Sequence, residues 1–423
     1  MLAASAIGSI VKKGELTIID ADGRTHVFGP GGAQRVTMRL HDKRLHTALF
    51  FNAPLALGEA YMDGTITVEN GRIDDLLDLL MMNLGTGTGA WPQTIARALQ
   101  HMMRRIDQYN PARRAKRNVA HHYDLSGDLY ALFLDGDRQY SCAYYANPDD
   151  TLEVAQEQKK RHIASKLALT KGQRILDIGS GWGGLGLYLA QIADARVTGV
   201  TLSEEQLKVA TLRAAEAGFT GRVEFRLEDY RALQGTFDRI VSVGMFEHVG
   251  IQHYRAYFDK VRDLLTDDGV ALLHWIGRSD GPGVTSPWIQ KYIFPGGYTP
   301  ALSEVLPVIE RSGLYVTDLE VLRLHYAETL KAWLDRFRAH WREAAAIYDE
   351  RFCRMWEFYL AGSQMGFRHQ GLVVHQIQLT KQIDTLPMTR DYMFDWERAH
   401  APQHHWPRVA ADRTRTGTSL PQE

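Results

Sequence analysis

The chain has 423 residues, which suits two domains, and its 45% hydrophobic content is enough for sizeable cores. Its formal net charge of −1 rules out a global polybasic character, so nucleic acid is not favoured as a partner. The two cysteines, Cys142 and Cys353, cannot make a disulfide framework and lack metal-ligand spacing. We therefore expect no metal site and a cytoplasmic location.

The N-terminal residues do not read as a secretory signal, because their charges, Lys12 and Lys13, follow the apolar stretch instead of preceding it. No later segment approaches the roughly 20 apolar residues that are needed to span a bilayer. Any membrane contact is therefore expected to be peripheral, at the inner face of the membrane.

Residues 1–100 are predicted to form a small N-terminal α/β domain. Two short β runs, at 16–19 and 25–28, flank a turn sequence at 20–23 and predict a hairpin. Another strand is expected at 36–40, and a mixed stretch ends in a β run at 64–68. The strongly apolar segment 73–84 predicts a helix that is more often core than lipid groove.

Residues 101–150 are predicted to form a helical linker and a lid over the cofactor and active site. They hold the one basic concentration of the chain, which comprises Arg104, Arg105, Arg113, Arg114, Lys116 and Arg117. A solvated helix face and a contact with anionic lipid headgroups explain this run equally well. The charges alone do not decide between them.

Residues 151–400 alternate between strand and helix patterns, which predicts a doubly wound α/β domain with a parallel sheet covered on both faces. The expected strands are 174–178, 196–202, 222–227, 238–243 and 269–276, and the expected helices are 152–169, 183–193, 204–217 and 251–266. An aromatic insertion at 280–300 and a long helical stretch at 327–362 follow. Residues 401–423 are polar and read as a tail.

A glycine-rich turn at 179–184 follows the first of these strands, and Asp177 stands just before it. A carboxylate there would repel the pyrophosphate of a dinucleotide at the helix N-terminus, which argues against NAD. S-adenosylmethionine has no phosphate and carries an ammonium and a sulfonium group, so the same acid favours it. The next strand ends at residues 201–206 without the usual acidic residue at its tip, and a nicotinamide enzyme or an unoccupied turn stays as an alternative.

Polar residues follow or interrupt the later strands. Glu247 and His248 come after the strand at 238–243, and His274 lies within the apolar run of the next strand. Ligand crevices of open α/β sheets lie outside the carboxyl ends of the strands, so these groups point to a site, although an ordinary loop glutamate is the simpler reading. A buried His274 needs a polar partner, and we expect that partner to be Glu247.

Seven strings occur in order over residues ~120 to ~370: 122–126, 140–145, 177–184, 201–206, 244–250, 293–297 and 366–368. Together they resemble the cyclopropane fatty acid synthases and the related mycolic acid methyltransferases. The resemblance implies a Rossmann-like class I methyltransferase domain preceded by a smaller domain that binds lipid. The chain departs from the family pattern at Ser363, where a cysteine is common, so no mechanism here should need a thiol at that position.

The resemblance also implies two sets of site residues. S-adenosylmethionine is expected to contact Tyr140, Ser141, Asp177, Gly179, Gly181, Trp182, Gly183, Gly184, Thr201, Leu202, Ser203, Gln206, Glu228 and Asp229. Gln206 is expected to hydrogen-bond the sugar in place of the missing acid. A bicarbonate ion near the transferred methyl group is expected to contact Cys142, Glu247, His274, Tyr326 and the backbone of Ile276.

The implied substrate is an unsaturated acyl chain that is still esterified in a membrane phospholipid. Transfer of a methylene group across its double bond would give a cyclopropane ring, through a carbocation that bound bicarbonate deprotonates. A fatty-acyl methyltransferase that makes methylene- or methyl-branched chains is the first alternative. A non-catalytic lipid-binding protein is a remote one, and the sequence leaves open whether the chain forms a homodimer.

Overall fold

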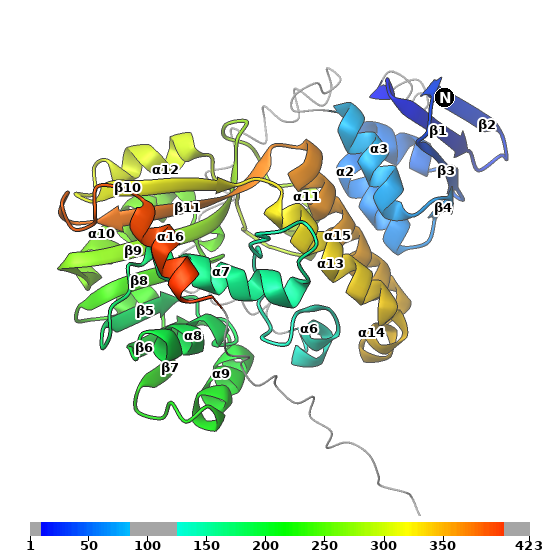
Figure 1. Cartoon of the computed structure of the whole chain (residues 1–423). Helices are drawn as coiled ribbons and strands as arrows, with labels where there is room; N and C mark the ends of the chain where they lie inside the picture. The colour runs from blue at the N-terminus through cyan, green and yellow to red at the C-terminus, as the bar shows by residue number, and fades with distance from the viewer. Residues whose placement is uncertain (1–9, 85–124, 402–423) are drawn as a thin grey trace, which may run out of the picture.

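The computed structural model describes residues 10–84 and 125–401 (Figure 1). Its N-terminal part holds a four-stranded sheet in the order β2-β1-β3-β4, built from β1 (Gly14–Ile19), β2 (Thr25–Gly31), β3 (Arg35–Leu40) and β4 (Ile66–Asn70). β1 and β2 are antiparallel across a turn in which the Gly23 amide donates to the Asp20 carbonyl at 2.8 Å. The predicted hairpin is thus confirmed.

Two helices accompany this sheet, α2 (Leu45–Met62) and α3 (Ile73–Leu84). α3 is the predicted apolar helix, and its residues Ile73, Leu76 and Leu79 are buried in the core. α2, which has Pro54 inside it, lies in the stretch that the sequence left without a predicted element. The structure accommodates the proline by a break at Asn52, where φ is −147° and the helix is kinked.

The N-terminal part packs on α15 (Glu350–His369), the long orange helix beside α2 and α3 in Figure 1, and shares one hydrophobic core with it. Gly58 of α2 faces Trp288 of α11 (Pro287–Tyr292), and a Cβ at Gly58 would lie 2.4 Å from the indole ring. Arg338 of the second part joins it to α3 through a hydrogen bond to Asp74 at 2.6 Å, and a bond to Glu357 of α15 at 2.7 Å holds the same guanidinium group. The two parts are therefore held together closely.

The second part is built on a seven-stranded sheet in the order β10-β11-β9-β8-β5-β6-β7. Its strands are β5 (Arg174–Ile178), β6 (Arg196–Thr201), β7 (Val223–Leu227), β8 (Phe237–Val243), β9 (Leu265–Arg278), β10 (Tyr315–Leu322) and β11 (Leu372–Thr380). The pairs among β5 to β9 are parallel, as predicted, whereas β11 runs antiparallel to both β9 and β10. The five predicted strands therefore form the expected parallel sheet, and β10 and β11, which were not predicted from sequence, add an antiparallel edge.

Helices cover both faces of this sheet, and the alternation of side chains decides which face each strand residue serves. Ile175 packs with α7 (Leu152–Lys166), α8 (Gly184–Ile192) and α9 (Glu204–Glu216). Its neighbour Leu176 packs with α10 (Tyr254–Leu264) and α12 (Leu302–Ile309) on the opposite face. The doubly wound α/β fold is confirmed.

The predicted helical stretch 327–362 is three helices, α13 (His325–Ala339), α14 (Trp341–Ile347) and α15. The break before α15 is fixed by Asp349, whose side chain accepts a hydrogen bond from the Phe352 amide at 2.6 Å and so begins a new helix. The basic run at 104–117 and the tail from 402 lie outside the described residues, while α6 (Gly127–Phe133) and α16 (Asp391–Ala399) lie within them. In the part of the chain that the structure describes, every helix is too short or too polar to cross a membrane.

Candidate functional site

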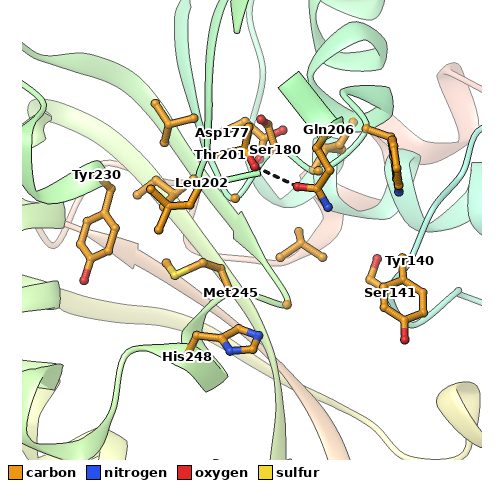
Figure 2. Close-up of a pocket in the computed structure, with 18 of the residues that line it drawn as sticks. Tyr140, Ser141, Asp177, Ser180, Thr201, Leu202, Gln206, Tyr230, Met245 and His248 are labelled. Atoms are coloured by element: carbon orange, nitrogen blue, oxygen red, sulfur yellow. Dashed lines mark hydrogen bonds between the residues drawn. The ribbon is translucent and has the colours of Figure 1, made fainter. Parts of the chain in front are cut away.

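A pocket opens at the carboxyl ends of β5, β6 and β8, and Asp177, Thr201 and Val243 from these strands line it (Figure 2). β5 lies between β6 and β8, so the chain turns in opposite directions from this point of the sheet. Ligands of doubly wound folds bind in the crevice that this reversal creates. The pocket therefore lies where the fold predicts a cofactor.

The glycine-rich turn shapes one wall of the pocket. Gly179, Gly181 and Gly183 have φ values of 83°, 53° and 84°, which other residues rarely adopt. Gly179, Gly181 and Gly184 line the pocket, as expected. Gly183 does not: a Cβ there would approach Phe225 to 2.8 Å, so this glycine serves the packing of the turn against the sheet.

Asp177 lies on the same wall and has a carboxyl oxygen without a hydrogen-bond partner. Its side chain is 2% exposed, and its Oδ2 has no hydrogen-bond partner in the structure. Burial raises the pKa of the carboxyl group to about 7. A positively charged group of a ligand would satisfy this oxygen and keep it ionised, so the residue fits the ammonium end of S-adenosylmethionine.

The orientation of Gln206 is fixed by residues at and just before the N-terminus of α9. Thr201 Oγ1 donates to Gln206 Oε1 at 2.8 Å, which leaves the amide nitrogen pointing into the pocket (Figure 2). Ser203 caps α9 by accepting from the Gln206 amide at 3.3 Å and does not line the pocket. The expected direct contact of Ser203 is therefore replaced by a role in holding Gln206.

The pocket has two distinct ends. Glu228, Asp229, Tyr230 and Met245 line one end, whereas Tyr140 and Ser141 lie at the other, as Figure 2 shows for the four of these residues that it labels. Trp182 and Leu202 also belong to the lining, as the sequence predicted. The sequence reasoning missed Tyr230 and Met245 as lining residues, and it singled out His248 beside Glu247 without assigning it to the cofactor.

Glu247 lies in a short 3-10 helix, Phe246–His248, just beyond β8. Its Oε1 accepts a hydrogen bond from the Ile276 amide at 2.6 Å, while its Oε2 is buried and has no partner. Burial raises the pKa of Glu247 to about 7. The structure thus joins two of the five expected bicarbonate contacts and leaves one carboxylate oxygen for a hydrogen-bond donor.

The expected partner of His274 was wrong. Its Nδ1 accepts from the amide nitrogen of Gln376 at 3.1 Å, and the two residues lie opposite each other on β9 and β11. Burial lowers the pKa of His274 well below its usual value, so the ring is neutral and Nε2 carries its proton. This assignment leaves His274 as a hydrogen-bond donor, which suits an anion.

Cys142 and Tyr326 come from segments that contact each other. The amide of Ala143, the residue after Cys142, donates to Thr329 of α13 at 3.0 Å, and Tyr326 lies in the first turn of the same helix. Cys142 is fully buried, and burial raises the pKa of its thiol, so it stays protonated. None of the five expected bicarbonate contacts lines the pocket, but their neighbours Ser141 and His248 do.

Comparisons with known proteins agree with this geometry. Residues 110–377 match the family model of the mycolic acid cyclopropane synthetases, and residues 11–86 match a domain of unknown function. A cyclopropane-fatty-acyl-phospholipid synthase of Escherichia coli is 38% identical over 354 residues, which cover 84% of this chain and 90% of the relative. A probable fatty acid methyltransferase of Pseudomonas putida is 36% identical over 393 residues, or 88% of this chain and 94% of the relative.

Solved structures point the same way. A mycolic acid cyclopropane synthase complexed with S-adenosylhomocysteine and CTAB has a TM-score of 0.60 and 34% identity, over 64% of this chain and 99% of that chain. The predicted family is confirmed: the chain belongs to the mycolic acid cyclopropane synthetase family and is an enzyme with the class I methyltransferase fold.

Proposed function

We propose that this enzyme uses S-adenosylmethionine to add a methylene group across the double bond of an unsaturated acyl chain in a membrane phospholipid, giving a cyclopropane ring. The observation that carries the proposal is Glu247, a buried carboxyl group with one oxygen bound to the Ile276 amide and the other without a partner. Its neighbour His248 lines the cofactor pocket, which supports a position of Glu247 near the transferred methyl group.

The pocket residues fit S-adenosylmethionine, which supplies the methyl group when bound. Asp177 offers its free oxygen to the ammonium group, and Gln206 directs its amide nitrogen toward the sugar hydroxyls. A relative of known structure binds S-adenosylhomocysteine, the product of methyl transfer. Because an unactivated alkene is a poor nucleophile, these residues must hold the cofactor firmly against the double bond, away from water.

Ring closure needs a base, because a proton must leave the newly added methyl group while the acyl chain carries a positive charge. Bicarbonate held by Glu247, His274, Tyr326, Cys142 and the Ile276 backbone would supply that base. The Nε2 proton of His274 suits one of its oxygens, and the unpartnered Oε2 of Glu247 suits its O–H. With a pKa of about 7, Glu247 can also be neutral, which removes repulsion between two anions.

The phospholipid substrate rests on the N-terminal part and on the relative from Escherichia coli, whose name includes fatty-acyl-phospholipid. At the break in α2, Phe51 is 75% exposed and contacts Phe50 edge-on. An exposed aromatic ring adds apolar area that a membrane interface can bury. We propose peripheral contact with the inner face of the membrane through this part, and flotation of Phe51→Ser with anionic phospholipid vesicles should show weaker binding than the parent.

The test of the function is expression in a bacterial host that lacks the activity, followed by lipid extraction and proton NMR of the fatty acyl esters. We expect the upfield ring-methylene signals of a cyclopropane, and their absence with Glu247→Gln. The relative from Pseudomonas putida, a probable fatty acid methyltransferase, favours a second candidate, a methyl- or methylene-branched product. That product can share the mass of the cyclopropane, but its olefinic or methyl proton signals would identify it and contradict ring formation.

A further inference from the structure

Lys159 of α7 is a buried cation with neutral hydrogen-bond partners. Its Nζ donates to Gln139 Oε1 at 2.6 Å and to Ser141 Oγ at 2.8 Å, and the residue is 0% exposed. Its neighbour Lys160 differs, because it makes ion pairs with Asp137 and Glu157, each at 2.9 Å. Within the described residues, no carboxylate oxygen lies within ion-pair distance of Lys159.

A buried charge without a counter-charge is costly, so its position calls for an explanation. Asp135, Asp137 and Asp177 are near enough for their charges and that of Lys159 to influence one another, but none of them forms an ion pair with Lys159, and Asp177 is the acid suited to the ammonium group of the cofactor. Asp135 accepts from the Gln139 amide at 2.8 Å, and Asp137 accepts from Lys160. An anion that is not part of the chain is therefore the natural complement of Lys159.

Ser141 connects Lys159 to the pocket. An ammonium group only donates hydrogen bonds, so the Ser141 oxygen must accept from Lys159, and the hydroxyl proton must point elsewhere. Ser141 lines the pocket, so its hydroxyl becomes a donor toward a bound ligand. Gln156 of α7 donates to the Ser141 carbonyl at 3.0 Å and holds the same residue from its backbone.

The layout of the pocket indicates which ligand group meets this donor. Glu228 and Asp229, which directly precede Tyr230 in the chain, supply polar groups suited to the sugar, and Figure 2 places Tyr230 at the opposite end of the pocket from Ser141. Asp177, with its unpartnered oxygen, is the acid suited to the ammonium group. The carboxylate of the same amino-acid moiety is left for the Ser141 end, where Lys159 supplies positive charge.

We propose that Lys159 is a positioning residue which, by orienting the Ser141 hydroxyl and supplying a buried positive charge, recognises the carboxylate of the methionine moiety of S-adenosylmethionine. This inference rests on the proposed use of S-adenosylmethionine. It does not depend on which acyl substrate accepts the methyl group.

The test compares two ligands of the full-length protein by isothermal titration calorimetry at neutral pH. S-adenosylhomocysteine carries the carboxylate, whereas 5′-methylthioadenosine keeps the adenosine and sulfur but lacks the amino-acid group. We expect Lys159→Met to weaken S-adenosylhomocysteine about 10- to 100-fold, the loss typical of a hydrogen bond to a charged group, and to change methylthioadenosine less than twofold. Ser141→Ala should act in the same way, and the double variant should be no weaker than Lys159→Met alone.

Lys160→Met is the matched control, because it removes a buried lysine of the same helix that belongs to an internal ion pair. It should keep the ratio of the two affinities. Equal weakening of both ligands by Lys159→Met and Ser141→Ala would overturn the proposal, since it would indicate a structural role. Unchanged S-adenosylhomocysteine affinity with a higher bicarbonate requirement for turnover would also overturn it, by assigning the charge to bicarbonate.

These outcomes separate the inference from the proposed function. A parent protein that binds S-adenosylhomocysteine with the expected selectivity but forms no cyclopropane would contradict only the proposed product. A parent protein that does not bind S-adenosylhomocysteine would contradict both.

Discussion

Helix α7 carries two buried polar clusters that differ in how completely they are paired. On the pocket side, Lys159 has neutral partners, and the nearby Asp177 has an oxygen with none. On the other side, His162 contacts Glu320 at 2.7 Å through Nε2 and Glu397 of α16 at 2.5 Å through Nδ1. α7 and α16 cross in front of the sheet in Figure 1, where the second cluster joins them.

The pKa values follow the same division. Burial raises the pKa of Asp177 to about 7, toward the neutral form. Next to His162, the hydrogen bonds and charges outweigh burial and lower the pKa of both Glu320 and Glu397, which favours their charged forms. One cluster is complete and acts as an internal cross-link, whereas the other lacks the partners that a ligand would bring.

The largest expected effect is on turnover, and it tests whether Glu247, a buried carboxyl group with one unpartnered oxygen, takes part in catalysis. Glu247→Gln keeps a side chain of the same size but removes the acid, so turnover should fall by about 100-fold or more. The affinity for S-adenosylhomocysteine should stay within about twofold, because Glu247 does not line the pocket. Steady-state kinetics and calorimetry give both values, and normal turnover would remove Glu247 from the mechanism.

The completely paired cluster should contribute to stability instead. Glu320→Gln leaves His162 and Lys166 without their shared carboxylate, and it should lower the free energy of unfolding by about 2 kcal/mol at neutral pH. Because folding lowers the Glu320 pKa, its contribution is present above the unfolded-state pKa of about 4.3 and lost as the pH falls below it. Urea unfolding at neutral pH and at a pH below about 4.3 measures the difference in unfolding free energy between parent and variant. If Glu320→Gln also weakened cofactor binding, the division into two clusters would be contradicted.

Asp177→Asn should have the opposite effect on stability. Since folding raises the Asp177 pKa to about 7, the parent loses stability as the pH rises from about 4 to 7, and the amide does not. The variant without ligand should therefore be about 1–2 kcal/mol more stable than the parent above pH 7 but about 2 kcal/mol less stable near pH 4 in urea unfolding, because the cost of its unpartnered buried amide applies at both pH values. The same variant should bind S-adenosylhomocysteine more weakly, and lower stability at high pH would indicate that Asp177 is already paired.

The smallest effect concerns the edge of the paired cluster. Ser165 Oγ lies 2.8 Å from the His162 carbonyl oxygen and 3.1 Å from the Glu397 carboxylate, so its one hydroxyl proton is shared between these two acceptors. Because Glu397 keeps its contact with His162, Ser165→Ala should cost only about 0.5–1 kcal/mol. Urea unfolding checks the value, and a loss as large as that of Glu320→Gln would show that the cluster depends on the serine.

The cofactor end of the site could be predicted because its signals are local. Asp177 and the glycines after it are contiguous, and Gln206 stands at a helix start within the next strand-helix unit. Gln376 could not be found in this way, because β11 reverses direction and comes about a hundred residues after His274, to which only the fold brings it. The five strands of the parallel region were recognised because each alternates with a helix along the chain. The two later strands were missed because they fall outside that local alternation.

The burial of Lys159 could not be predicted from sequence, because a charged side chain on a polar helix is expected to be exposed. α7 has the composition of a solvated helix, yet Lys159, Lys160, His162 and Lys166 are at most 5% exposed. Charged residues are almost never fully buried unless they are paired, so sequence reasoning assigns such a helix to the surface. The residues that pair with these side chains and allow their burial come from other segments of the chain. The sequence periodicity of α7 does not indicate them.

The contact between Gly58 and Trp288 limits how this protein can be recombined. A Cβ at position 58 would collide with the indole ring, so a chimera that joins a foreign N-terminal part to this catalytic part must bring a glycine at that position or a smaller side chain opposite it. Asp74 and Arg338 impose a second matching condition across the same junction. An N-terminal part and a catalytic part can therefore be combined in a chimera only if both of these contacts are preserved.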